Sequence, residues 1–216
     1  MAEHPAQPGR SEGELPGLDY SRFVAKIGAD PEVVARIYSR YVRWFRGCTR
    51  VVDLGSGRGI FLEVLRNAGI PAYGVDPDAT LVKSSMSRGL EVVVGGAVEH
   101  LASLAPGTVD GIFMGHVIEH MDHEAKFRLA RLSFERLAPQ GVMVVETPNT
   151  TSPFVMFNVY YLDPTHQVPL HPDAYRFIFT DAGFGVALSE FHMLAPGKTA
   201  GEETEGMNYS LVLRKP

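Results

Sequence analysis

A carboxylate and three alternate glycines stand together where a buried strand is predicted to end, in the stretch Asp53-Leu54-Gly55-Ser56-Gly57-Arg58-Gly59. Glycines let the backbone turn and approach a ligand without a Cβ clash, and a helix that follows points unpaired amides at the loop. A carboxylate repels a pyrophosphate at close range and attracts a positive group. The stretch therefore predicts a site for a nucleotide-like, positively charged ligand, contacted by Asp53, Gly55, Ser56, Gly57 and Gly59.

A second carboxylate narrows the choice of ligand. Asp76 ends the next predicted strand, where its two oxygens can accept both hydroxyls of a ribose. The glycine spacing departs from the dinucleotide fingerprint G-x-G-x-x-G, because Ile60 stands where that pattern has its third glycine. An adenosyl group with a cationic tail fits both acids better. The alternative is a glycine turn of an ordinary α/β domain, with Asp53 in a structural role.

Two segments with histidines could act on an acceptor. In His116-Val117-Ile118-Glu119-His120, a helix would place His116, Glu119 and His120 on one face, a spacing that suits one divalent ion such as Mg²⁺. The alternative is that these side chains face the substrate or cap the helix without a metal. The segment also matches H-x-x-E-H of zinc peptidases, although it follows a strand directly here and those enzymes carry it on a long helix.

Strands and helices alternate along the chain, which predicts a doubly wound α/β sheet with right-handed crossovers. We expect one domain over 18–216, with N-terminal cap helices in 18–46 and a substrate-side insertion at 150–172, after a flexible tail over 1–17. The connector 195–206 is predicted to be mobile. The predicted strands are 50–54, 72–76, 91–94, 109–114, 142–146, 185–193 and 207–213, and the predicted helices are 20–27, 31–45, 59–68, 78–87, 122–137 and 173–182.

Composition limits the function classes. The 216 residues carry a net charge of -5, which disfavours a nucleic-acid partner. One cysteine, Cys48, allows no intramolecular disulfide and no thiolate metal cluster, and it suits a reducing compartment. No apolar run approaches the length of a membrane span, and the N-terminus lacks a basic and then apolar leader. We expect a soluble cytoplasmic protein.

Over roughly residues 50 to 213 the chain resembles the class I S-adenosylmethionine-dependent methyltransferases. Residues 53–59 match their D-x-G-x-G-x-G loop, and further stretches resemble their later motifs: 73–76, 95–99, 109–120 and 137–141. The resemblance implies a Rossmann-like, mostly parallel seven-stranded sheet with an antiparallel last strand and helices on both faces. It also implies S-adenosylmethionine as cofactor, with contacts from Pro77, Ala97, Val98 and Gly115. Gly96 stands where the family often has an acid.

A narrower likeness lies in the stretches 146–149 and 161–166, followed by Pro169, His171 and Pro172. These residues resemble methyltransferases that modify bacterial polysaccharides, including O-antigen chain terminators. Those relatives often have Cys in place of Ser56 and Arg in place of Val168. Residues 116–120 are also similar to some ubiquinone-pathway methyltransferases, for which the resemblance implies metal binding, with His116 here in place of an acid.

Methyl transfer to a hydroxyl needs the acceptor held in line and its proton removed, a task that suits histidine. We expect His166 to be the base, with Asp163 orienting it or holding a sugar hydroxyl and His120 as a further catalytic residue. The alternative for His166 is a loop histidine bonded to backbone. An aromatic wall for a sugar competes with lid or core packing at four positions: Phe154, Phe157, Tyr160 and Tyr161.

The predicted function is O-methylation of a saccharide hydroxyl in an oligosaccharide or polysaccharide precursor or chain end. One alternative is a methyltransferase for small quinones or phenols, which the aromatic loop and residues 116–120 also permit. The other is a cofactor-binding partner of a glycosyltransferase without catalysis of its own.

Overall fold

The computed structural model describes residues 17–194 and 206–216. Seven strands form one sheet in the order β3-β2-β1-β4-β5-β7-β6. Five are parallel to one another, and β7 runs antiparallel to both of its neighbours. The strands are β1 Val51–Leu54, β2 Ala72–Asp76, β3 Val92–Val94, β4 Val109–Gly115, β5 Leu137–Pro148, β6 Gly185–Leu194 and β7 Gly206–Arg214. The predicted sheet, with its antiparallel last strand, is confirmed.

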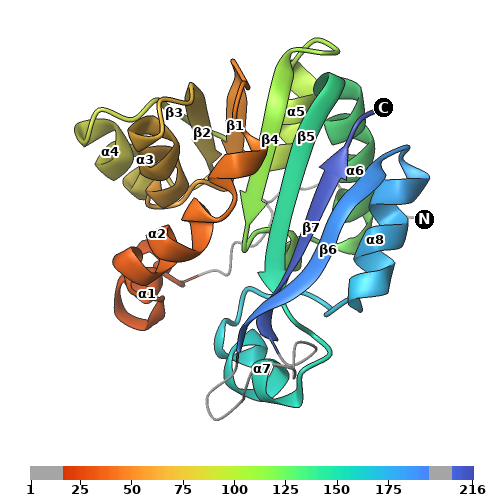
Figure 1. Ribbon diagram of the computed structural model, residues 1–216. Helices are drawn as coiled ribbons and strands as arrows, with labels where there is room; N and C mark the ends of the chain where they lie inside the picture. The colour runs from red at the N-terminus through yellow and green to blue at the C-terminus, as the bar shows by residue number, and fades with distance from the viewer. Residues whose placement is uncertain (1–16, 195–205) are drawn as a thin grey trace, which may run out of the picture.

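Helices cover both faces of this sheet (Figure 1). Apolar residues of α5 (Ala97–Ser103), α6 (His123–Arg136) and α8 (Pro172–Asp181) fill one core cluster. The opposite cluster contains Tyr41 and Phe45 and residues of α3 (Ile60–Asn67), which pack on Phe113 of β4. The remaining helices are α1 Tyr20–Ile27, α2 Pro31–Ser39, α4 Ala79–Ser87 and α7 Pro153–Asn158, with short 3-10 turns at Val42–Trp44, Ile118–His120 and Tyr160–Leu162.

The structure differs from the sequence prediction in several local elements. The predicted helix 31–45 ends at Ser39 and is followed by the turn Val42–Trp44, while α5 and α7 were not predicted. Strand β5 is longer than 142–146 because it begins at Leu137 and continues to Pro148. Most of the predicted tail and nearly all of the 195–206 connector lie outside the described residues.

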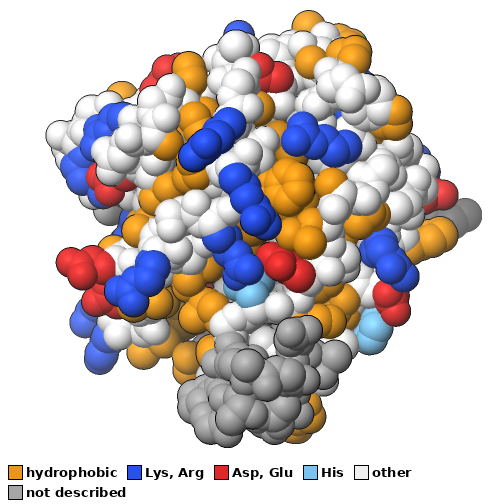
Figure 2. Space-filling view, viewed as in Figure 1, with side chains coloured by type: hydrophobic (Ala, Val, Ile, Leu, Met, Phe, Trp, Pro, Cys, Tyr) orange, Lys and Arg blue, Asp and Glu red, His pale blue; other side chains and the backbone are white. Residues whose placement is uncertain are grey.

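The carboxyl ends of β4 and β5 point toward the end of the molecule where α7 lies (Figure 1). Ligands of open α/β sheets bind beyond these strand ends. Figure 2 shows Lys and Arg side chains spread over the middle of the face that it views, with Asp and Glu among them. In the part of the chain that the structure describes, no helix has the length and apolarity needed to cross a bilayer.

Candidate active site

The glycine loop after β1 has backbone angles that favour glycine. Gly55, Gly57 and Gly59 have φ angles of 71°, 50° and 69°, the left-handed region that favours glycine. A Cβ on Gly55 would lie 2.3 Å from Val117 Cγ2. Both the backbone angle and the space therefore exclude a side chain at Gly55.

Two buried acids flank this loop. Asp76 accepts hydrogen bonds from the amides of Gly57 and Asp78, at 2.7 Å and 2.9 Å from its two oxygens. Burial raises the pKa of Asp53 well above its usual value, and the negative charge of Asp76 adds to this shift. Burial also raises the pKa of Asp76, although its two amide bonds oppose this. A positively charged ligand would offset the free-energy cost of burying the charged form of Asp53.

The other predicted cofactor contacts surround the same loop. Pro77 follows Asp76 directly and is exposed, and Gly115 ends β4. Ala97 and Val98 are buried in the first turn of α5, where backbone amides have no partner within the helix. Ser56 lies against Gly74 of the neighbouring strand, and its buried hydroxyl has no hydrogen-bond partner among the described residues.

His116 does not share a helical face with Glu119 and His120. Its φ of 57° takes it out of any helix, and only Ile118–His120 form a single 3-10 turn. This geometry contradicts the spacing argument for a metal site with His116 as a ligand, and it equally contradicts the long-helix motif of a peptidase. The imidazole instead lies between two carboxylates.

Those carboxylates, Glu119 and Glu146, are fully buried. His116 Nδ1 is 3.2 Å from Glu119 Oε1, and its Nε2 is 3.1 Å from Glu146 Oε1. Burial lowers the pKa of His116, but the contacts with the two carboxylates outweigh it and raise that pKa to about 10. The side chain is 37% exposed. At neutral pH His116 is therefore an imidazolium that bridges two acids and has no lone pair for a metal.

Glu146 also anchors a buried polar network that connects the cap to the sheet. Its other oxygen accepts from the hydroxyl of Tyr41 and lies 3.3 Å from His192 Nε2. His192 Nε2 is 2.6 Å from Ser210 Oγ, and Asn208 donates to Glu146 at 2.9 Å. Burial raises the pKa of Glu146, yet its two histidine partners lower it to about 2.

Sequence reasoning missed the residues that this network adds. Tyr41 and His192 come from segments far from the motifs, so no local pattern marks them. Asn208 and Ser210 do leave a signal, because they put polar side chains at alternate positions of a strand that is otherwise largely apolar. Such alternation in a buried strand indicates that one face meets other polar groups.

Three ligand-type side chains converge beside this network. Atoms of Glu119, His120 and His166 lie within 4.8 Å of one another. The two imidazole rings are 4.6 Å apart between centroids. The structure thus places two of the predicted residues, Glu119 and His120, beside His166 from a distant loop, and His116 is not a member of this group.

Each of the two imidazoles has its Nδ1 committed. His166 Nδ1 is 2.6 Å from the carbonyl oxygen of Tyr160, so it must carry a proton and donate. His120 Nδ1 is 2.7 Å from Thr165 Oγ1, whose hydroxyl lies 2.6 Å from Asp163 Oδ1. The Thr165 hydroxyl donates its hydrogen bond to this carboxylate, so the Thr165 oxygen accepts a hydrogen bond from His120 Nδ1. In the neutral form of each ring, Nε2 is then the nitrogen with the lone pair.

Asp163 therefore bonds elsewhere than the sequence predicted. Its carboxylate contacts Thr165 and the hydroxyl of Tyr20, the latter at 3.4 Å, rather than His166. Through Thr165 it orients His120 instead. Burial lowers the pKa of His120, which keeps that imidazole neutral. The contact with Tyr20 places cap helix α1 beside the acceptor residues.

The predicted aromatic wall divides into buried and exposed members. Tyr160 is buried, with its hydroxyl donating to the carbonyl of Gln167 at 2.9 Å. Phe157 and Tyr161 are 77% and 63% exposed, and Phe154 is 39% exposed. Packing explains Tyr160, and three aromatic side chains remain open to solvent.

The sheet order, the glycine loop and the two acids define a Rossmann-like protein of the class I methyltransferase type. A family model described as a methyltransferase domain matches residues 19–188. The chain belongs to this methyltransferase family and is an S-adenosylmethionine-dependent enzyme.

Relatives agree with this family. A crystal structure of a methyltransferase of the same cofactor dependence from Archaeoglobus fulgidus has a TM-score of 0.82 and 30% identity, covering 91% of this chain and 100% of that one. A ubiquinone biosynthesis O-methyltransferase from Azorhizobium caulinodans is 30% identical over 134 residues, 58% of this chain and 51% of the relative. One of the same name from Caulobacter sp. (strain K31) is 30% identical over 107 residues, 47% and 42%. The chain spans about half the length of these curated relatives.

Proposed function

We propose that this enzyme transfers the methyl group of S-adenosylmethionine to a hydroxyl oxygen. The supporting observation is the pair of imidazoles, His120 and His166, whose Nδ1 atoms are committed to hydrogen bonds and whose rings lie beside Glu119. A hydroxyl must lose its proton as it is methylated, and a positioned imidazole is suited to accept it. His166 is the proposed base, and Asp163, acting through Thr165, holds His120 in its tautomer.

The residues around the glycine loop fit the cofactor. Asp53 is a buried acid that a cationic ligand would stabilise, and Asp76 offers carboxylate oxygens for ribose hydroxyls. The glycine loop, with Ser56 and Pro77, is the proposed contact surface for the nucleoside. When bound, S-adenosylmethionine supplies an electrophilic methyl group. The remaining proposed contacts are those of Ala97, Val98 and Gly115.

A divalent ion also fits the acceptor side. Glu119, His120 and His166 provide one carboxylate and two imidazoles, and the second ring nitrogen of each histidine is fixed by a hydrogen bond, as is usual for metal ligands. Imidazole donors suit zinc and similar ions, whereas magnesium prefers oxygen ligands. We propose an ion of the zinc type in place of the magnesium that the sequence suggested. Because the ion would take the Nε2 lone pair of His166, this arrangement is an alternative to His166 as the general base. The bound ion would then lower the pKa of an acceptor hydroxyl.

Two acceptor classes have specific support. A saccharide hydroxyl is favoured by the resemblance of 161–172 to polysaccharide-modifying enzymes and by the polar loop around Asp163. A quinol or phenol is favoured by the names of the two ubiquinone-pathway relatives and by the exposed aromatic side chains near the site. The saccharide is the acceptor that we put first, because the loop that carries His166 also carries that resemblance.

Transfer of labelled methyl groups tests the proposal. The purified enzyme would be incubated with labelled S-adenosylmethionine and two panels, one of oligosaccharides and one of catechols and quinols. Label in an oligosaccharide supports the saccharide acceptor, and label only in the phenolic panel supports the quinol. Label in neither panel, with cofactor binding intact, would contradict hydroxyl methylation of both classes.

A further inference from the structure

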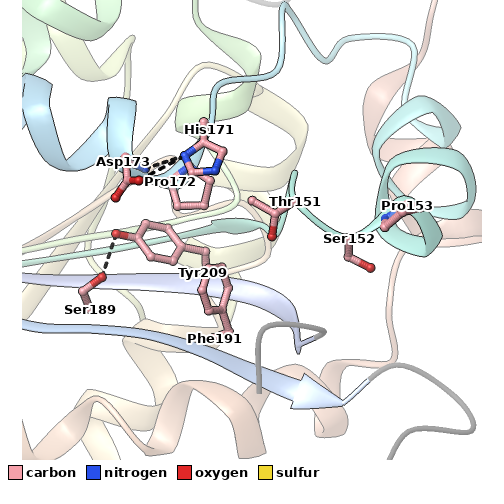
Figure 3. Close-up of a pocket in the computed structure, with 9 residues that line it drawn as sticks. All are labelled: Thr151, Ser152, Pro153, His171, Pro172, Asp173, Ser189, Phe191 and Tyr209. Atoms are coloured by element: carbon pink, nitrogen blue, oxygen red, sulfur yellow. Dashed lines mark hydrogen bonds and ion pairs between the residues drawn. The ribbon is translucent and has the colours of Figure 1, made fainter. Parts of the chain in front are cut away.

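A pocket opens over β6 and β7, next to the start of α8 (Figure 3). It has a volume of about 470 Å³, within the range of small-molecule sites. Four segments line it: the loop after β5, the start of α8, β6 and β7. The lining residues are Thr151, Ser152, Pro153, His171, Pro172, Asp173, Ser189, Phe191 and Tyr209.

The rim offers both donors and acceptors. The Asp173 amide donates to His171 Nδ1 at 3.1 Å, so the neutral imidazole carries its proton on Nε2 and is a donor there. The Asp173 carboxylate is an acceptor whose charge is balanced by Arg176, 3.0 Å away. Thr151 donates its hydroxyl proton to Asn149 at 2.6 Å, which leaves its oxygen as an acceptor.

The floor of the pocket is aromatic and apolar. Phe191 and Tyr209 are cross-strand partners whose ring centroids are 5.3 Å apart. Ser189 lies at its edge, 2.9 Å from the hydroxyl of Tyr209. Figure 3 shows these rings on one side of the pocket and His171 with Asp173 on the other. An apolar floor under a mixed, nearly neutral polar rim matches a ring with CH groups on its face and hydroxyls around it.

Other ligand chemistries fit less well. A phosphate group would meet the carboxylate of Asp173. A hydrocarbon chain would cover the polar ring edge of His171 and the carboxylate of Asp173 without offering either of them a hydrogen bond, which is costly. A sugar ring can satisfy both the rim and the floor.

The pocket is one strand away from the reaction centre. Tyr209 pairs directly with Thr147 of β5, so both side chains lie on the same face of the sheet. Thr147 in turn donates to Glu119 Oε2 at 3.1 Å. We propose that this pocket is an acceptor subsite that binds a sugar ring next to the one that is methylated, an inference that rests on the saccharide acceptor of the proposed function.

Binding without turnover tests the subsite. Ligand-observed NMR would titrate cellobiose, maltose and mannobiose onto wild-type enzyme and onto Ser189→Trp, which fills the pocket from an exposed position. Val186→Trp is the matched control, because Val186 is an exposed residue of the same strand outside the pocket. We expect at least one disaccharide to bind wild type and Val186→Trp alike, and its dissociation constant to rise at least about tenfold in Ser189→Trp, as for about 1.4 kcal/mol lost.

Equal binding to Ser189→Trp and wild type, or no binding of any of the three sugars, would overturn the subsite. Thr151→Trp fills the pocket from a second exposed position and serves if Ser189→Trp fails to bind the cofactor. Because no methyl transfer is measured, failure of the subsite is distinct from failure of the proposed function. Failure of the proposed function would appear as absent methyl transfer to oligosaccharides while disaccharide binding persists.

Discussion

Two buried acids lie at the cofactor end of the site and two lie at the acceptor end, and the pKa values of the two pairs are shifted in opposite directions. Burial raises the pKa of Asp53 and Asp76 at the cofactor end. At the acceptor end, contacts with histidines lower the pKa of Glu119 and Glu146 in spite of burial. Among the described residues no cationic side chain is a cause of the shifts of the first pair, whereas both acids of the second pair contact His116.

This difference suggests how the two ends are used. An acid that has no internal cation gains most from a positive ligand, which suits a sulfonium cofactor. Glu146 already contacts His116 and the hydroxyl of Tyr41, so it fixes the positions of these partners. The acceptor end is therefore a preorganised framework around His120 and His166.

The largest expected effect is on stability. Glu146→Gln should lower the free energy of unfolding by about 3 kcal/mol, because it removes the charge of a buried network and one of the two carboxylates that pair with the His116 imidazolium. Asp53→Asn should raise that free energy or leave it within about 1 kcal/mol, because it removes a desolvated charge. Chemical denaturation of the two variants measures both values. Equal destabilisation by both would contradict the contrast between the two ends.

The next effect is on cofactor affinity. Asp76→Ala should weaken S-adenosylmethionine binding about 100-fold, because two charge-assisted hydrogen bonds to ribose hydroxyls are lost at about 1.5 kcal/mol each. Calorimetry would measure the dissociation constant. Asp110→Asn is the control, since Asp110 binds Thr49 and Arg50 at the opposite end of the strands. An unchanged affinity of Asp76→Ala would remove this acid from the cofactor site.

Metal removal should have a smaller effect, and only at the acceptor end. Treatment with EDTA should slow methyl transfer about tenfold while cofactor affinity is kept, because a bound ion contributes to acceptor activation only. Zinc or manganese should restore the rate better than magnesium. A rate that is indifferent to chelation would leave Glu119, His120 and His166 as a metal-free group.

The smallest effect concerns His116 and pH. Its pKa of about 10 exceeds the ordinary 6.5, so its ion pairs stabilise the fold fully below pH 6.5 and lose this effect as pH rises through 10. The difference in melting temperature between wild type and His116→Gln should therefore narrow from pH 6.5 to pH 10. Thermal melts across this range measure it. A constant difference would show that His116 does not act as an imidazolium.

The strand, loop and helix around the glycine motif could be predicted from the sequence because these residues are local in the chain. The seven strands follow from alternating apolar runs, and residues 53–59 with Asp76 need only one strand-loop-helix unit and its neighbour. Their left-handed glycine angles agree with the motif. Residue spacing is enough to predict such a unit because a single loop connects its strand to its helix.

The acceptor end could not be predicted from the sequence because it is formed by segments that are far apart in the chain. The partners of Glu146 come from the cap, β6 and β7, which no local pattern links. The spacing of residues 116–120 misled because the positive φ of His116 breaks the expected helix. The orientation of His120 depends on Thr165, whose hydroxyl position only the structure reveals.

The most direct test of the account uses His166→Ala with two measurements on one preparation, the cofactor dissociation constant and the rate of methyl transfer to an accepted hydroxyl compound. We expect the affinity for S-adenosylmethionine to stay within about twofold while the rate falls about 100-fold or more, as for loss of a general base. An unchanged rate would remove His166 from the mechanism, and a matching loss of cofactor affinity would contradict the separation of the two ends.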